Sequence, residues 1–148
     1  MAAPKTASFG KFLVYIARPS APDTWLAPCG FTSRAFRRTK DTTDTVVPDC
    51  DDPDLPADIE RVVKSKSWQV TGEGVGAADA QAIWDEFFDD GDAWPIKIEF
   101  AWPSPTGTIA YTGAGHLTQL EMTGAQGDKV KQSVTIVSDG ALTRSPAL

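Results

Sequence analysis

One stretch of this sequence has the spacing of an amphipathic helix, and its isolation constrains the fold more than any other feature. From Ala77 to about Asp90, apolar residues recur every three or four positions and form one continuous stripe. The members of the stripe are Ala80, Ile83, Trp84, Phe87 and Phe88. Gly91 follows as a C-terminal stop signal. Because no other stretch has this spacing, the remaining apolar residues must be buried mainly by strands.

Most of the other apolar residues have the alternation that is typical of short strands. In the clearest case, Ile96, Ile98, Phe100 and Trp102 share one face, while Lys97 and Glu99 point the other way. Further strands are expected over residues 11–17, 31–40, 66–71, 108–112, the segment after Gly113 and Gly115, and 130–137. The two glycines indicate a bulge or bend. About seven strands and one helix predict a mainly β fold, an antiparallel sandwich or barrel with the helix on its flank.

The chain has the length of a single domain, residues 1–148. We expect flexible tails at residues 1–9 and 140–148. The first residues lack the apolar core of a signal peptide, and no apolar run approaches the roughly 20 residues that cross a bilayer. We therefore expect no membrane partner, and we expect free thiols at the two cysteines, Cys29 and Cys50.

An acidic, proline-rich stretch interrupts the strand pattern. Between Asp41 and Glu60 there are eight acids and no base. The prolines at 48, 53 and 56 cannot donate to a strand ladder, so residues 39–60 are predicted to form a long acidic loop. Basic residues flank the acids on both sides, at Arg34, Arg37, Arg38, Lys40, Arg61, Lys64 and Lys66. This alternation of charge would let the loop dock against a copy of itself; a solvated surface loop is the competing interpretation.

Metal binding and catalysis find little support in the sequence. An EF-hand loop beginning at residue 49 would have Pro53 at its fifth position and Asp54 at its sixth, where an oxygen ligand and a glycine are required. A looser calcium site on three acids of the loop stays open as an alternative: Asp51, Asp52 and Asp54. Zinc lacks ligands, because His116 is the only histidine and no CxxC motif occurs. We therefore expect no metal, no cofactor and no catalytic residue.

A glycine-rich segment before the helix is the strongest competing signal. GEGVGA, Gly72–Ala77, fits the dinucleotide-binding pattern, and Glu99 lies twenty-two residues after Ala77. However, the preceding KSKSWQVT is half polar, whereas a central parallel strand is continuously apolar. With only one helix, no second βαβ unit can complete such a sheet. Nucleotide binding remains the minor alternative.

Read in order, these elements resemble the tail tube protein (major tail protein) family of long-tailed bacteriophages and gene transfer agents. The resemblance extends from about Gly10 to Gly140. The segments that carry it are GKFLVYIA, VVPDCDDPD, SWQVTGEG, IWDEFFDDGD, WPIKIEF and TGAGHLTQLEMTGAQGDKVKQSVTIVSDG. The last is the most characteristic, with a glycine-kinked strand, a GD turn and a closing SVT strand. The segment ARPSAPDTWLAPCGF matches no pattern of the family that we can name.

The resemblance implies a structural subunit that assembles into stacked hexameric rings around a channel for DNA. One sheet of each subunit would join its neighbours around the channel, and the long loop, residues 39–60, would reach another subunit or ring. Candidate interface residues are therefore Arg37, Arg38, Val46, Val47, Asp49, Asp51, Asp52, Asp54 and Leu55. Implied partners are further copies of the chain, the tape measure, the tail terminator and the distal tail protein. The implied location is the tail of a virion or phage-like particle, after synthesis in the bacterial cytoplasm.

The net charge of −6 agrees with a channel that DNA passes through without specific binding, because phosphate-binding cations would add affinity and drag. Two related assemblies remain open as alternatives, a tail terminator and the tube of a contractile secretion system.

Overall fold

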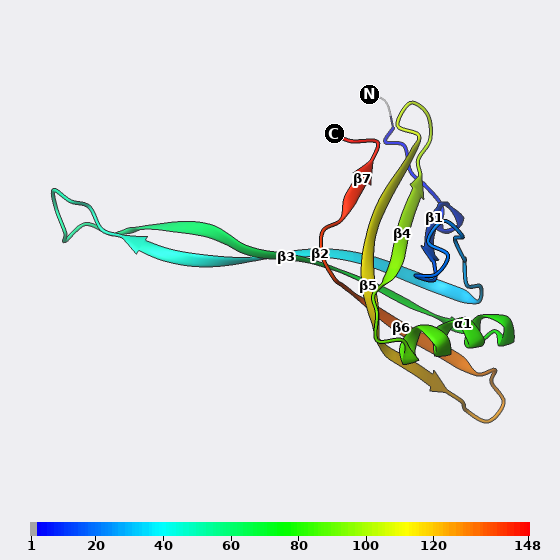
Figure 1. The fold of residues 1–148 in the computed structure, drawn as a ribbon. Coiled ribbons are helices and arrows are strands. Elements are labelled where there is room, and N and C mark those ends of the chain that lie inside the picture. The colour runs from blue at the N-terminus through cyan, green and yellow to red at the C-terminus, as the bar shows by residue number, and fades with distance from the viewer. Residues whose placement is uncertain (1–2) are drawn as a thin grey trace.

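The chain forms one curled antiparallel sheet of seven strands with a single helix against it, as the computed structural model of residues 3–148 shows (Figure 1). The mainly β fold class expected from the sequence is confirmed. The strands are β1 (Phe12–Ile16), β2 (Phe31–Val47), β3 (Asp58–Val75), β4 (Trp94–Ala101), β5 (Thr108–Thr123), β6 (Lys131–Ser138) and β7 (Thr143–Ser145). The helix α1 covers Ala78–Asp89, and a short 3-10 helix covers Phe9–Lys11.

The order of strands in the sheet is β1-β4-β5-β6-β3-β2, and β7 pairs with β5 beside this path. Strand β5 joins the two parts of the sheet. Its first half, up to Gly115, pairs with β4, and its second half, from Gly115 onward, pairs with β6. The sheet curls so that these parts face each other. Phe36 of β2 packs against Tyr111 of β5, with ring centroids 5.5 Å apart.

The core lies between the helix and the concave side of the curled sheet. Trp84 and Phe87 project from α1, and the Phe87 ring stacks on Trp94 of β4 at 4.7 Å. Burying such apolar side chains contributes about 1.5–3 kcal/mol each. The buried hydrophobic residues are Ile16, Ala17, Trp68, Val70, Ala80, Trp84, Phe87, Trp94, Ile96, Ile98, Leu117, Val134 and Ile136.

The apolar stripe of α1 is narrower than the sequence suggests. Ala80, Trp84 and Phe87 are buried and Ile83 is half-buried, but Phe88 is 50% exposed. At 3.6 residues per turn, Phe88 lies about 80° around the helix from Ala80, at the margin of the stripe. A sheet that covers only one side of the helix does not reach it, so the expectation that Phe88 belongs to the core is wrong.

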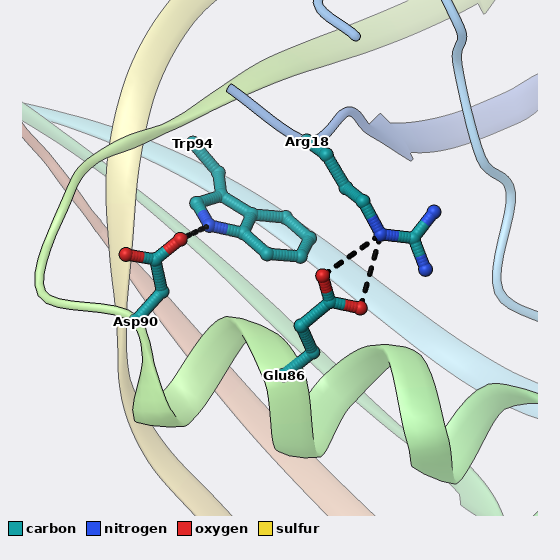
Figure 2. A network of polar contacts seen from close by, with 4 residues as sticks. All are labelled: Arg18, Glu86, Asp90 and Trp94. Carbon is teal, nitrogen blue, oxygen red and sulfur yellow. Dashed lines mark hydrogen bonds and ion pairs between the residues drawn. The ribbon is translucent and has the colours of Figure 1, made fainter. Parts of the chain in front are cut away.

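The helix ends at Asp89 and is capped by Asp90, without a glycine in the left-handed conformation (Figure 2). Asp90 is already extended, with φ −78° and ψ 131°, and its Oδ2 accepts a hydrogen bond from Trp94 Nε1 at 2.8 Å. One turn earlier, Arg18 Nε donates to both carboxylate oxygens of Glu86, each at 3.0 Å. Two of the acids at this helix end are therefore bound to other elements: Glu86 to Arg18 in the loop that follows β1, and Asp90 to Trp94 at the start of β4.

The predicted long loop is the main error in the sequence interpretation. Of the predicted residues 39–60, residues 39–47 belong to β2 and residues 58–60 to β3, and only residues 48–57 form a connecting loop. All three prolines fall within this shorter loop, where no ladder donor is needed. The residues before it are TTDTVV, and their branched side chains favour a strand. The prolines terminate the pairing but do not prevent it on either side.

The two ends of the chain also differ from the prediction. Residues 143–145, expected in a C-terminal tail, form β7 and pair with Ala110–Thr112 of β5. At the other end, residues 3–8 have no regular secondary structure, and residues 1 and 2 of the expected tail lie outside the described part.

Gly113 and Gly115 lie inside one long strand, β5, which curves where its pairing passes from β4 to β6 at Gly115 (Figure 1). Strand β5 runs through both of them, and its register shift lies later, between Leu117 and Gln119. A Cβ atom at Gly113 would lie 3.1 Å from the Trp68 ring, and one at Gly115 would lie 2.8 Å from the Val137 carbonyl oxygen. These positions are glycine because neighbouring groups approach the backbone closely.

Candidate functional site: an exposed arm and a polar sheet face

The most unusual surface of the molecule is a long hairpin that projects from the sheet, residues 39–67, which we call the arm (Figure 1). Strand β3 pairs with β6 only between Gln69 and Val75, so beyond Gln69 the two strands of the hairpin have no third partner. Every residue of the arm is exposed. A two-stranded hairpin is marginally stable by itself. The arm therefore lacks, within the subunit, the covering surface that would stabilise it.

Aliphatic side chains lie on both faces of the arm. Cross-strand pairing places Val46 opposite Ile59 on one face, and Val62 lies opposite Thr43 on the other. Between 40% and 65% of each of these six aliphatic residues is exposed: Val46, Val47, Leu55, Ile59, Val62 and Val63. Exposed apolar groups on an unprotected strand pair are typical of a surface that another chain covers.

The acids at the end of the arm shape its tip, residues 48–57. Asp49 Oδ1 accepts a hydrogen bond from the Asp51 N–H at 2.8 Å, and Asp52 Oδ1 accepts one from the Asp54 N–H at 3.2 Å. Such turns hold the chain locally. Within residues 3–148 no group of three or more His, Cys, Asp or Glu side chains is arranged to hold a metal ion. Cys50, also at the tip, and Cys29 are both free and exposed.

The predicted interface residues fall at two separate ends of the arm. Val46 and Val47 end β2, and five more lie in the tip: Asp49, Asp51, Asp52, Asp54 and Leu55. Arg37 and Arg38 lie at the root of the arm, on opposite faces of β2. The Arg38 guanidinium stands over the Tyr111 ring, 4.9 Å from its centroid.

Sequence reasoning missed the β3 side of the arm. Ile59, Val62 and Val63 were assigned to the loop or its flank, because the prolines drew the whole segment into one irregular stretch. The signal that could have found them is the branched run IERVV, which favours a strand opposite TTDTVV.

A second candidate surface is the outer face of β2, β3, β6 and the second half of β5, which we call the polar face. The pairing registers align its side chains in rows across the four strands. One row is Ala35, Thr71, Thr135 and Gln119; the next is Ser33, Glu73, Ser133 and Glu121. No aromatic side chain lies in these rows, and four of the eight side chains carry a hydroxyl group.

The charges of the polar face are few and of both signs. Glu73 and Glu121 are offset by Arg37 and Lys131 on the same side of the sheet. At one end, His116 Nε2 lies 3.1 Å from Asp139 Oδ2. The face is therefore hydrophilic without the dense positive charge of a nucleic-acid-binding surface.

The sheet ends in two margins, β1 and β2, and each has a strand partner on one side only. Arg34 of β2 spans the gap between them, because its Nη1 donates a hydrogen bond of 2.6 Å to the Phe12 carbonyl oxygen. Its guanidinium also stands over the Phe9 ring at 4.5 Å. Partial burial lowers the pKa of Arg34. The Arg34 side chain, and not strand pairing, connects β1 to β2 here. Backbone N–H and C=O groups along the outer edges of both strands are therefore left for other partners.

The glycine-rich segment does not form a nucleotide site. Gly72 and Gly74 lie inside β3, which pairs antiparallel with both β2 and β6. The strand after the helix, β4, lies between β1 and β5 and is not a neighbour of β3. The βαβ interpretation is wrong, because the two strands flanking α1 are not parallel neighbours.

In the described residues, no helix has the length and apolar character needed to span a bilayer.

A small sheet with open margins, an uncovered arm and one extended polar face defines a subunit of a self-assembling structural protein. The sequence comparison narrows this class: the phage tail tube protein family matches residues 6–144. The chain therefore belongs to the phage tail tube protein family and is a structural tail tube subunit. No protein of curated function matches the chain in sequence.

Solved structures share this fold at low sequence identity. The tail of an empty gene transfer agent particle, refined with C6 symmetry, is 15% identical and has a TM-score of 0.72; the match covers 93% of this chain and 98% of that one. The SPP1 tail tube is 8% identical with a TM-score of 0.68, covering 94% and 78% of the two chains. A PVC sheath–tube complex of an extracellular contractile injection system is 14% identical with a TM-score of 0.62, covering 96% and 93%.

Proposed function

We propose that copies of this chain close into hexameric rings, and that the rings stack into a hollow tube in the tail of a phage or phage-like particle. The observation that carries the proposal is the arm, which exposes aliphatic groups on both faces and finds no covering partner in its own subunit. The C6 symmetry of the similar gene transfer agent tail supports the number six.

In this assembly the margins of the sheet join neighbouring subunits. Strand β2 has a free edge along its length, and the second half of β5 has a free edge beyond Gly115, where β4 no longer covers it. Pairing these edges around a ring would extend the four-stranded sheet into a closed barrel, which removes exposed edges.

The polar face would then line the channel. Hydroxyl and amide groups hydrate the surface, and the mixed charges give DNA no row of cations to bind. This arrangement supports the passage of DNA without specific binding. The tape measure, the tail terminator and the distal tail protein would contact the tube along its channel and at its ends.

Electron microscopy of the purified chain tests the proposal. We expect rings or tubes at high protein concentration, or when the chain is expressed together with other tail proteins. A deletion of residues 49–56 tests the arm: the subunit should stay folded, because every residue of this tip is exposed, but tubes should disappear. A chain that stays monomeric under all these conditions would contradict the proposal.

A tube inside a contractile device is the second candidate, because the PVC sheath–tube complex has the same fold. Continuous tubes that bind a separately expressed sheath protein would favour that role. Single rings that do not stack would instead favour a tail terminator.

A further inference from the structure

A groove lies at the root of the arm, between the hairpin and the segment that follows β6. It has a volume of about 1020 Å³ and lies beside Trp68. One wall carries four basic residues, Arg38, Lys40, Lys64 and Lys66; the other wall is Ser138–Leu142. Val63 and Leu142 add apolar surface. We call this the basic groove.

The positive charges of the basic groove are not neutralised within the subunit. Lys40 and Lys66 are direct cross-strand partners, so two like charges face each other. Such pairs destabilise a hairpin. No carboxylate of residues 3–148 forms an ion pair with any of the four basic residues. The one acid of the groove, Asp139, is bound to His116.

The tip of the arm has the opposite charge and is equally uncompensated. Asp49, Asp51, Asp52 and Asp54 crowd into six positions, and none forms an ion pair in the described part of the chain. Leu55, beside them, is 48% exposed. Acids and an aliphatic group at the tip thus match cations and aliphatic groups in the basic groove.

The tip cannot reach the basic groove of its own subunit. Val47 lies seven positions after Lys40 along the paired strand, and at about 3.3 Å per residue this places the tip roughly 23 Å away. Figure 1 shows the arm extended away from the body of the subunit. The occupant that fits both the charge and the distance is therefore the tip of another copy.

We propose that the acidic tip of each arm docks into the basic groove of a second copy of this chain. The inference rests on the proposed tube and names the receptor surface for its arm. Because tip and groove are different patches of one chain, the contact is head-to-tail and can repeat without limit along a tube. The charges at both ends, unfavourable in the free subunit, are satisfied only on assembly.

Charge reversal and charge exchange test this contact in the full-length chain. The groove variant K40E/K64E/K66E and the tip variant D51K/D52K/D54K should each raise the critical concentration for tube formation by about tenfold or more. A chain with all six substitutions should assemble again, because each tip once more meets a groove of opposite charge. A mixture of the groove variant and the tip variant should also associate. Salt near 1 M should weaken the wild-type contact by screening.

Matched controls separate this contact from net charge and from folding. D79K/D85K/D89K places three reversals on the exposed side of α1 and should leave assembly unchanged. All variants should keep the wild-type unfolding temperature within a few degrees, because the substituted groups are exposed.

Each outcome decides between the two proposals. The groove contact is overturned, while the tube stands, if the wild type forms tubes and the groove variant and the tip variant do so equally well. The same conclusion follows if the wild type forms tubes and the chain with all six substitutions fails to recover assembly. If the wild type forms no tubes but the groove and tip variants associate in sedimentation, the contact stands and the tube falls. If a duplex oligonucleotide binds the wild type and not K40E/K64E/K66E, while that variant still forms tubes, the groove is a nucleic-acid site and the proposal is wrong.

Discussion

Trp94 Nε1 donates a hydrogen bond of 2.8 Å to Oδ2 of Asp90, four residues before it in the chain. Oδ1 of the same carboxylate accepts a hydrogen bond from the Asp92 N–H at 3.0 Å. Figure 2 shows the Asp90–Trp94 contact. One acid thus fixes the turn between α1 and β4 and orients the indole that stacks on Phe87. These two hydrogen bonds, led by that from Asp92, lower the pKa of Asp90.

Replacing Asp90 with Ala should lower the unfolding temperature of the subunit by a few degrees and broaden the fluorescence of Trp94. The lowered pKa means that the ionised carboxylate is favoured in the folded state. Its contribution is therefore complete above the ordinary Asp pKa of about 3.9 and is lost as the pH falls through the lower folded value. The difference between wild type and D90A should be constant near neutral pH and should shrink in acid. Asp89→Ala is the control; an equal effect there would contradict this role.

The neighbouring phenylalanines of α1 should respond in opposite ways to truncation. Phe87 is 1% exposed and packs between Trp84 and Trp94, so Phe87→Ala should lower the free energy of unfolding by about 3–5 kcal/mol. Phe88→Ala removes a half-exposed ring and should change it by no more than about 0.5 kcal/mol. Urea denaturation of the unassembled subunit measures both. Equal losses would place Phe88 in the core.

Gly115 should not tolerate a side chain. A Cβ atom there would lie 2.8 Å from the Val137 carbonyl oxygen and 3.0 Å from Ile136 Cγ2, so the sheet would have to shift. Gly115→Ala should therefore cost about 1–3 kcal/mol of unfolding free energy. Gly124 has open space around its Cα and is the matched control. A Gly115→Ala chain as stable as Gly124→Ala would show that the close approach has no energetic consequence.

Local patterns in the sequence were sufficient for the elements whose burial is regular. The alternation of Ile96, Ile98 and Phe100 predicted β4, and the helical stripe predicted α1 within one residue at each end. The arm could not be predicted in the same way, because nothing in its own subunit covers it and its residues therefore have no buried face. Its prolines, which mark only the tip, were the strongest local signal.

The positions of the candidate surfaces depend on which strands pair and in which register, and the sequence alone does not specify either. The acids of the tip were visible as a cluster, but their separation from Arg37 and Arg38 follows from the register of β2 on β3. The polar face likewise becomes visible only when four strands, distant in sequence, are aligned side by side. The basic groove needs both the root of the arm and the segment after β6.

The aliphatic side chains of the arm should matter for assembly and not for the stability of the subunit. Ile59 and Val62 are 55% and 65% exposed, on opposite faces of the hairpin. The double variant I59T/V62T keeps strand-forming residues and should leave the unfolding temperature nearly unchanged. It should raise the critical concentration for tubes several-fold, measured by sedimentation. Val130→Thr, which removes a 52% exposed aliphatic group outside the arm, is the control. Normal assembly of I59T/V62T would remove these side chains from the interface.

A cation introduced on the polar face should convert the channel into a DNA-binding surface. Thr135 lies in the middle of the face, between Thr71 of β3 and Gln119 of β5. Thr135→Lys adds one positive charge per subunit, and in a ring these charges would converge on the channel axis. Tubes of this variant should retain a short labelled duplex and protect it from nuclease, and raising the salt concentration should release it. Asp85→Lys, on the exposed side of α1, should bind no protected DNA. If the Asp85→Lys tubes protect the duplex from nuclease and the Thr135→Lys tubes do not, the helix lines the channel and the polar face does not.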